Sequence, residues 1–276
     1  MTGIRLAVVT LAYNNVEEVR KTLASVALQS VQPDSFLVVD SSSSGVNREV
    51  ENLARRASAK YTWIEPDGVY PAMNHALSLL PDQNYVWFIN SSDWLAGPNS
   101  ISAVLSAISP GDSWLIGGLE RLGDRRNPYH PTPSTGEAFV NALAAGRVGF
   151  PHPSAVIAKS IIDSVGGFDA SLKIAADYKQ ALAVARLVGA PRVTERVLSV
   201  HVPTGLTSRH KLKHAIEKLR ARFSTVPSHG LGKEIATQLA TLGRIIKPSN
   251  SSQAMNQSRQ GENRFGQEID SWPGES

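Results

Sequence analysis

The fold prediction for this chain of 276 residues begins with the segment Val86-Trp87-Phe88-Ile89-Asn90-Ser91-Ser92-Asp93. An apolar run that ends abruptly in Asn-Ser-Ser-Asp is typical of a buried strand that delivers a carboxylate to the edge of a sheet. In open α/β folds that edge is where ligands bind. A second informative segment precedes it, Glu65-Pro66-Asp67-Gly68-Val69-Tyr70-Pro71-Ala72-Met73-Asn74. Together the two segments predict a ligand site that contains Asp93.

Apolar runs alternate with helical patterns in the first part of the chain. Strands are predicted over residues 4–11, 36–39, 61–64 and 85–89, and helices over 16–28, 47–58 and 72–80. This β-α-β-α order predicts an α/β fold with a single, mostly parallel central sheet flanked by helices.

The pattern changes after residue 92. Helices are predicted over 99–108, 134–145, 159–165 and 174–188, and extended segments over 114–117, 154–158 and 193–202. From 208 to 247 the chain is amphipathic and strongly basic, which predicts a helical appendage. Residues 248–276 are rich in Ser, Asn, Gln, Gly and Glu with few apolar anchors, and we expect a disordered tail there.

Composition narrows the classes of protein that the chain can belong to. Hydrophobic residues make up 42% and charged residues 19%, as in ordinary globular proteins. No apolar run is long enough to span a bilayer, and the start of the chain lacks the pattern of a secretory signal. The chain has no cysteine, so disulfides and cysteine-bound metals are excluded. We therefore expect a cytoplasmic protein.

Several ordered motifs resemble those of family 2 glycosyltransferases with the GT-A fold, and in particular the bacterial members that build polysaccharides and glycolipids. The matching segments are Ala12-Tyr13-Asn14, Ser25-Val26-Ala27-Leu28-Gln29, Val38-Val39-Asp40, Gly68-Val69-Tyr70-Pro71-Ala72-Met73-Asn74, Ile89-Asn90-Ser91-Ser92-Asp93, Gly166-Gly167-Phe168-Asp169 and Ala176-Asp177-Tyr178. The resemblance implies one GT-A domain over 1–207, with a donor half about 1–97 and an acceptor half about 98–207. The basic appendage (208–247) and the tail (248–276) follow it.

The resemblance also implies an activity. We expect an inverting enzyme that moves a sugar from a nucleoside-diphosphate donor, with a UDP-sugar as the first candidate, to a saccharide or lipid-linked acceptor in cell-surface glycan synthesis. On the donor side, Asp40 is expected to accept the ring N–H of a uracil-type base, with Thr10, Ala12 and Tyr13 closing the same site. Two plainer readings stay open: Asp40 caps its own loop, and Tyr13 is a core residue.

Asp93 is the candidate metal ligand, for a divalent Mn²⁺ or Mg²⁺ that bridges the donor phosphates. Relatives often carry two acids here, and Ser91 stands where the first would lie. The alternative is that Asp93 caps a following turn. The resemblance places Asp67, Asn74 and Ser92 beside the donor.

Asp177 is the candidate general base, which takes the proton of the acceptor hydroxyl as that oxygen attacks the anomeric carbon. Asp169 competes for the role, but its position after Gly-Gly-Phe is typical of a turn residue. His152 is expected to border the acceptor. Thr207 belongs to a segment, 204–207, that resembles a loop closing over the diphosphate.

The basic stretch has two readings. It is either a helix lying on anionic lipid headgroups, which would place the protein at the inner face of the membrane, or a packed helix with a solvated charged face. Nucleic-acid binding is not expected, because aromatic residues are not interleaved with the basic ones.

Three other functions stay open. A nucleotidyltransferase usually begins with a Gly-rich phosphate loop and a lysine, and none follows the first strand here. The remaining two are a non-catalytic relative that only binds sugar or nucleotide, and a basic adaptor at a membrane surface.

Overall fold

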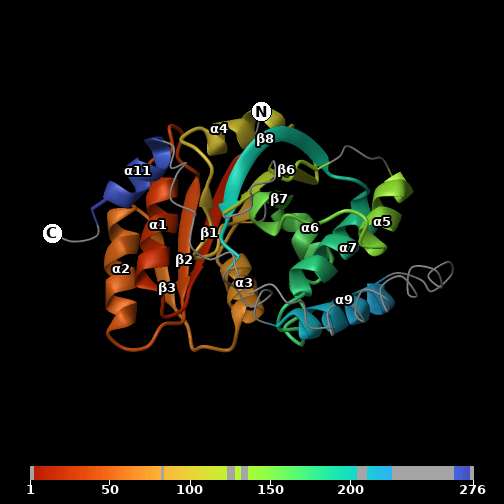
Figure 1. Cartoon of the computed structure of the whole chain (residues 1–276), viewed down its shortest axis with the longest axis horizontal. Helices are drawn as coiled ribbons and strands as arrows, with labels where there is room; N and C mark the ends of the chain where they lie inside the picture. Colours follow the sequence, from red (N-terminus) through yellow and green to blue (C-terminus); the bar gives the residue numbers. More distant parts are fainter. Residues whose placement is uncertain are drawn as a thin grey trace, which may run out of the picture.

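The central sheet has eight strands in the order β3-β2-β1-β4-β7-β6-β8-β5 (Figure 1). The structure is a computed structural model that describes residues 3–81, 84–122, 128–131, 136–203, 210–225 and 264–273. The strands are β1 (Arg5–Ala12), β2 (Ser35–Asp40), β3 (Lys60–Trp63), β4 (Asn84–Phe88), β5 (Trp94–Leu95), β6 (Trp114–Arg121), β7 (Ala155–Ala158) and β8 (Arg192–His201).

The sheet consists of a parallel half and a mixed half. The parallel half consists of β3, β2, β1 and β4, which run parallel to one another, as the sequence predicts for the first part of the chain. β7 is antiparallel to both β4 and β6, β8 runs parallel to β6, and β5 is antiparallel to β8. Because β5 pairs with the last residues of β8, the end of β8 lies beside the segment that follows β4.

Helices cover both faces of the sheet, so the strands of its parallel half are buried on both sides. Within β1, Leu6 and Val8 pack in one core cluster while Ala7 and Val9 pack in the other. This explains why β1 is a continuous apolar run rather than an alternating one. The first cluster involves α1 (Val16–Ala27), α2 (Val46–Arg56) and α4 (Ser100–Ala107); the second involves α3 (Val69–Ser78), α5 (Gly136–Ala144), α6 (Lys159–Ser164) and α7 (Ala176–Val188).

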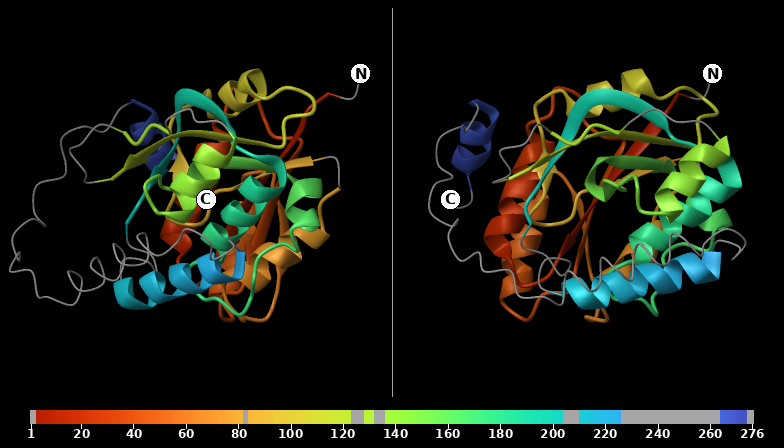
Figure 2. Two further views of the ribbon diagram at one scale, coloured as in Figure 1. Left: turned by 90° about the vertical axis from the view of Figure 1, so that its right-hand side faces the viewer. Right: turned by 45° about the vertical axis from the view of Figure 1, so that its right-hand side comes forward.

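Two further helices lie on opposite sides of the molecule (Figures 1 and 2). α9 (Lys211–Thr225) packs against α7, and α11 (Arg264–Ser271) packs against α1. No helix among the described residues has the length and apolar character needed to cross a membrane.

The structure differs from the expected disordered tail over residues 264–273. Phe265 and Ile269 are buried against Ala24 of α1, and Trp272 packs beside them. These three apolar residues recur at helical spacing and give α11 one apolar face, although the polar composition of the tail hides it.

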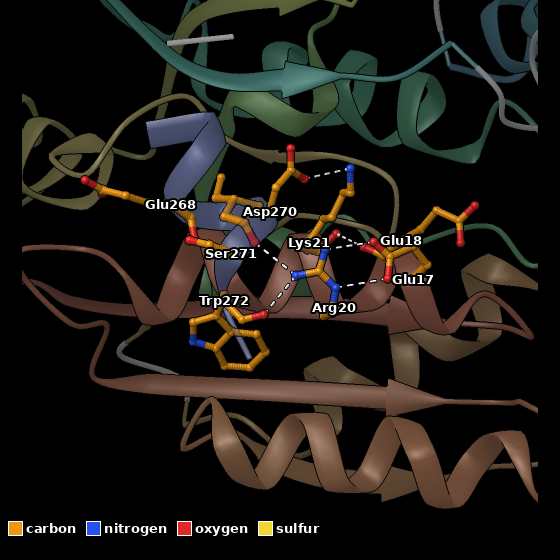
Figure 3. A network of polar contacts seen from close by, with 10 residues as sticks. Glu17, Glu18, Arg20, Lys21, Glu268, Asp270, Ser271 and Trp272 are labelled. Carbon is orange, nitrogen blue, oxygen red and sulfur yellow. Dashed lines mark hydrogen bonds and ion pairs between the residues drawn. The ribbon is translucent and has the colours of Figure 1, made fainter. Parts of the chain in front are cut away.

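Polar contacts fix the position of α11 on α1 (Figure 3). The Nη1 atom of Arg20 donates to the carbonyl oxygens of Ile269 (3.0 Å) and Trp272 (3.1 Å), which lie at the end of α11. The Nζ atom of Lys21 lies 2.8 Å from a carboxylate oxygen of Asp270. The guanidinium of Arg20 also pairs with Glu17 one turn earlier. A cation at the carboxyl end of a helix satisfies its free carbonyls and stabilises its dipole.

We predict that Ile269→Asp detaches α11, because a buried apolar side chain is replaced by a charge at a cost of about 3 kcal/mol or more. Hydrogen exchange should show loss of protection over 264–271 with unchanged protection in β1. The exposed change Gln267→Asp is the control. Equal protection in all three proteins would contradict the packing described here.

Candidate functional site

The parallel half of the sheet brings three loops to one edge. The register of β1 and β2 places Ala12 beside Asp40, and the N–H of Ser91 donates to the carbonyl of Leu11 (3.1 Å), so the segment after β4 follows the same edge. Asn15 then donates from Nδ2 to the Oγ atom of Ser91 (2.7 Å). The residues that the sequence assigns to the nucleotide therefore lie where parallel strands end, which is the ordinary ligand edge of an α/β sheet.

Asp40 is buried and takes part in two hydrogen bonds at this edge. Oδ1 accepts from the N–H of Ser42 (2.9 Å), and Oδ2 accepts from the hydroxyl of Tyr61 (2.9 Å). Burial, followed by the bond to Asp40, raises the pKa of the Tyr61 hydroxyl. The loop-capping geometry left open by the sequence is therefore present. A carboxylate has further acceptor positions, so recognition of a base by Asp40 stays a prediction.

The neighbours of Asp40 differ in exposure. Thr10 is buried and its hydroxyl has no hydrogen-bond partner among the described residues, and Ala12 is buried beside Asp40. Tyr13 is 60% exposed, so its reading as a core residue is wrong and its ring is free to stack on a ligand. Trp63, at the end of β3, is also exposed at this edge and donates from its indole N–H to the carbonyl of Ser42. No motif marked Trp63 in the sequence.

Asp93 binds the end of β8. Its Oδ1 accepts from the N–H of Val202 (3.1 Å) and lies 2.8 Å from Nδ1 of His201, while Oδ2 makes no hydrogen bond within the described part of the chain. Strand β5 follows Asp93 directly, so Asp93 does not cap a turn. Ser92, just before it, has a φ of 88°, a conformation that non-glycine residues rarely adopt and that costs about 1–3 kcal/mol. This strained residue aims the carboxylate at His201.

A row of aromatic rings leads from the end of β4 to Asp177. Phe88 stacks on His152 (6.0 Å between centroids), and His152 meets Phe168 edge to face (6.2 Å). Phe168 in turn stacks on Tyr70 (5.9 Å), whose hydroxyl donates to Oδ1 of Asp177 (3.1 Å). His152 thus lies between the elements that carry Asp93 and Asp177.

The electrostatics of His152 agree with this position. Burial lowers the pKa of its imidazole, whereas the charges of Asp177 and then Asp93 raise it to a smaller extent. Both carboxylates therefore lie within electrostatic reach of one imidazole, although 84 residues separate them along the chain. His152 is held largely uncharged, which suits a side chain that lines a substrate site rather than one that carries positive charge.

The start of α7, which carries Asp177, is held by a residue of α9. Oε2 of Glu217 accepts from the backbone N–H groups of Lys173 (3.0 Å), Ile174 (2.7 Å) and Ala175 (3.1 Å). These N–H groups belong to the segment that leads into α7, whose N-cap is Ala175, and a carboxylate close to this end also stabilises the helix dipole. Glu217 is buried, so α9 is a packed element of this end of the site. The sequence showed only an isolated acid in a basic stretch.

Asn74 and Asp169 have structural partners. The amide of Asn74 accepts from the N–H of Phe168 and donates to its carbonyl, both at 2.8 Å, and so clamps the turn instead of facing a ligand. Gly167 in that turn has a φ of 72°, and a Cβ atom there would lie 2.7 Å from Oδ1 of Asn74. Asp169 pairs with Lys179 at 2.6 Å, which fits its reading as a turn residue. Asp67 lies exposed in the loop before α3, and Thr207 lies outside the described residues.

Comparisons with known proteins agree with this architecture. No family model matches the chain. Two curated relatives, the uncharacterized glycosyltransferases MT1564 and Rv1514c of two strains of Mycobacterium tuberculosis, are each 26% identical over 220 residues, which cover 78% of this chain and 81% of each relative.

Three solved structures share the fold. TarS of S. aureus has a TM-score of 0.59 at 18% identity, and the match covers 88% of this chain but only 49% of TarS. The mannosyltransferase PcManGT of Pyrobaculum calidifontis has a TM-score of 0.56 at 18% identity and covers 88% and 76% of the two chains. Glucosyl-3-phosphoglycerate synthase of Mycobacterium tuberculosis has a TM-score of 0.56 at 18% identity and covers 82% of both. These likenesses confirm the expected GT-A fold, and the two relatives named glycosyltransferases agree with the expected class of enzyme.

We predict that the pair of Asp169 and Lys179 makes stability depend on acid pH. The hydrogen bonds from Lys179 and Ser171 lower the pKa of Asp169 to about 2. The carboxyl of an aspartate in an unfolded chain has a pKa of about 3.9. The stabilisation of the folded protein by ionised Asp169 is therefore present above about pH 4 and is lost as the pH falls towards 2. Asp169→Asn should therefore cost about 1–2 kcal/mol at neutral pH and almost nothing near pH 2, measured by thermal unfolding. Glu51→Gln, which breaks an exposed pair with Arg55, is the control and should change little. A cost that is the same at both pH values would contradict the assignment.

Proposed function

From the GT-A fold and the two relatives named glycosyltransferases, we propose that the chain transfers one sugar with inversion from a nucleoside-diphosphate donor to a saccharide or lipid-linked acceptor in cell-surface glycan synthesis. The observation that carries this proposal is the row of rings from Phe88 through His152 to Tyr70, which connects the strand before Asp93 with the carboxylate of Asp177. The first carboxylate suits the donor diphosphate and the second suits the acceptor hydroxyl.

A UDP-sugar is the proposed donor. Structures of TarS 1–349 contain UDP and UDP-GlcNAc, and that of glucosyl-3-phosphoglycerate synthase contains UDP, whereas PcManGT is seen with GDP-Man. In this chain the base would lie at the edge formed by Asp40 and the exposed rings of Tyr13 and Trp63, which can stack on it.

Asp93 and His201 are the residues that would hold a divalent cation. Asp93 has an oxygen free of hydrogen bonds, and the imidazole of His201 is partly exposed beside it. The described residues contain no group of three or more acidic or histidine side chains that would hold a metal alone, so donor phosphates are expected to complete the coordination. PcManGT and glucosyl-3-phosphoglycerate synthase are seen with Mn²⁺. When bound, such an ion stabilises negative charge on the departing nucleoside diphosphate.

Asp177 is the proposed general base. Oδ1 already accepts from the Tyr70 hydroxyl and from the N–H of Tyr178, so the carboxylate has a fixed orientation and Oδ2 is available for the acceptor. Oδ2 would take the proton of the acceptor hydroxyl while that oxygen forms the new bond to the anomeric carbon. The bond to the diphosphate breaks on the opposite face, which inverts the configuration.

The outward face of α9 supports contact with an anionic membrane surface. Leu212, Ile216 and Phe223 are 46%, 42% and 55% exposed and lie on one stripe of the helix, with Arg220 exposed beside them. An apolar stripe with a basic flank is the pattern of helices that lie in the headgroup region. This contact would place the enzyme at the cytoplasmic face of the membrane, near a lipid-linked acceptor.

For the general base, we predict that Asp177→Asn lowers kcat by about 10²- to 10⁴-fold because the acceptor hydroxyl loses its proton acceptor. UDP affinity, measured by calorimetry with Mn²⁺, should not change. Asp169→Asn is the matched control and should keep most of the transfer activity. Transfer that survives in Asp177→Asn but is lost in Asp169→Asn would assign the base to Asp169.

For the cation, we predict that His201→Ala weakens Mn²⁺-dependent binding of UDP by at least about tenfold, because one ligand is lost. The measurement is calorimetry with and without Mn²⁺, with His75→Ala on α3 as the control. If His201→Ala binds UDP and Mn²⁺ as the unmodified protein does, the metal site lies elsewhere.

For the membrane, we predict that Ile216→Glu reduces sedimentation of the protein with vesicles that contain phosphatidylglycerol. The change puts a negative charge into the apolar stripe. Leu187→Glu, at an exposed leucine of α7, is the control and should sediment normally. If both variants sediment equally with the vesicles, the apolar stripe of α9 does not contact the membrane.

A further inference from the structure

The inward face of α9 carries three basic side chains at a spacing of four residues, His214, Lys218 and Arg222. All three are at least partly buried, and Arg222 is only 3% exposed. They lie against the first turn of α7, where the Nζ atom of Lys218 is 4.5 Å from the centroid of the Tyr178 ring. The Nε atom of Arg222 donates to the Tyr178 hydroxyl (2.7 Å). We call these three residues the inner basic stripe.

No carboxylate of the described residues bonds directly to the inner basic stripe, although the charge of Asp177 acts on His214 and Lys218 and that of Glu217 acts on His214. Among the described residues, neither Lys218 nor Arg222 forms a salt bridge, and the buried Nη2 atom of Arg222 has no hydrogen-bond partner. Glu217 is the one acid of α9, and its Oε2 is occupied by three backbone N–H groups of the neighbouring segment. Burying cations without an anion costs free energy, and a ligand that supplies the anion recovers it.

Asp177 borders the stripe. Its charge acts on both His214 and Lys218, as it does on Tyr70 of α3 and His152 of η1 (His152–Ser154). Burial and the charge of Arg222 lower the pKa of Lys218, and the charge of Asp177 opposes them. The stripe therefore lies near Asp177 on α9, an element separate from the segment after β4 that carries Asp93 and from β8, which carries His201.

We propose that the inner basic stripe binds a phosphate group of the acceptor, close to the hydroxyl that Asp177 deprotonates. This inference rests on the proposed function and adds the chemical class of the acceptor to it. A phosphate suits the stripe because an ammonium and a guanidinium both bind phosphate oxygens through charge-assisted hydrogen bonds. The Tyr178 ring favours the cation that lies over it. The amino end of α7 carries the positive end of the helix dipole and favours an anion nearby.

The phosphate can come from a soluble sugar phosphate or from a lipid-linked acceptor. Both present the same group to Lys218, so the test needs one probe for each source. Inorganic phosphate stands for the first, and vesicles of phosphatidylcholine that carry a polyprenyl phosphate stand for the second. Phosphatidylcholine vesicles without the polyprenyl phosphate show the background.

The experiment measures binding of each probe to the full chain in the absence of donor, by calorimetry and by the NMR signal of the His214 imidazole. We expect phosphate to shift the His214 signal and to bind at least about tenfold more weakly to Lys218→Met, which is a difference of about 1.4 kcal/mol. Lys213→Met is the matched control, since Lys213 lies on the outward face of the same helix. Its phosphate affinity should equal that of the unmodified protein.

Three results decide between this proposal and its alternatives. Binding of neither probe, or equal binding by Lys218→Met and Lys213→Met, would overturn it and leave the stripe as packing around Tyr178. A parallel loss of UDP affinity in Lys218→Met would also overturn it, because the stripe would then serve the donor. Binding is measured without turnover, so a failure of the transferase proposal would appear separately, as an unmodified protein that neither binds UDP nor transfers sugar.

Discussion

The contact between Asp93 and the end of β8 joins the two halves of this protein at its site. Asp93 follows the parallel half of the sheet, and β8 closes the mixed half, so the bonds to His201 and Val202 fix the two halves relative to each other. The sheet order makes this contact possible, because β8 pairs with the short strand that follows Asp93. A carboxylate placed in this way has one oxygen engaged in structure and one available for a ligand.

The acceptor side depends on α9 in a comparable way. Glu217 binds the segment that leads into α7, and the neighbouring Lys218 and Arg222 pack around Tyr178, which is adjacent to Asp177. Through Glu217, α9 therefore holds the segment before Asp177, the proposed general base. Its basic residues Lys218 and Arg222 lie beside the same turn, and its exposed apolar residues face outward. The segment therefore has two different faces, an inner one with His214, Lys218 and Arg222 packed around Tyr178, and an outer one with exposed apolar residues.

The sequence predicts the fold well because the parallel strands are buried on both faces, which leaves continuous apolar runs such as that of β1. It also predicts roles for Asp93, His152 and Asp177 from ordered motifs, and in the structure a row of rings links His152 to Asp177. It does not predict the part played by Glu217, since binding the backbone of the segment before α7 depends on tertiary contact rather than on local pattern. Nor does it reveal α11, whose three apolar anchors are diluted by a polar tail. Asn74 matches a motif, yet its amide is occupied by the backbone of Phe168.

A crystal structure with UDP and Mn²⁺ bound is the most direct test of the central claim, that Asp93 and Asp177 flank one nucleotide diphosphate. The account predicts the diphosphate beside Asp93 and His201, the uracil at the edge formed by Asp40 and Tyr13, and Asp177 on the far side of the position for the transferred sugar. A nucleotide bound away from this edge, or on a face from which Asp177 is out of reach, would contradict it.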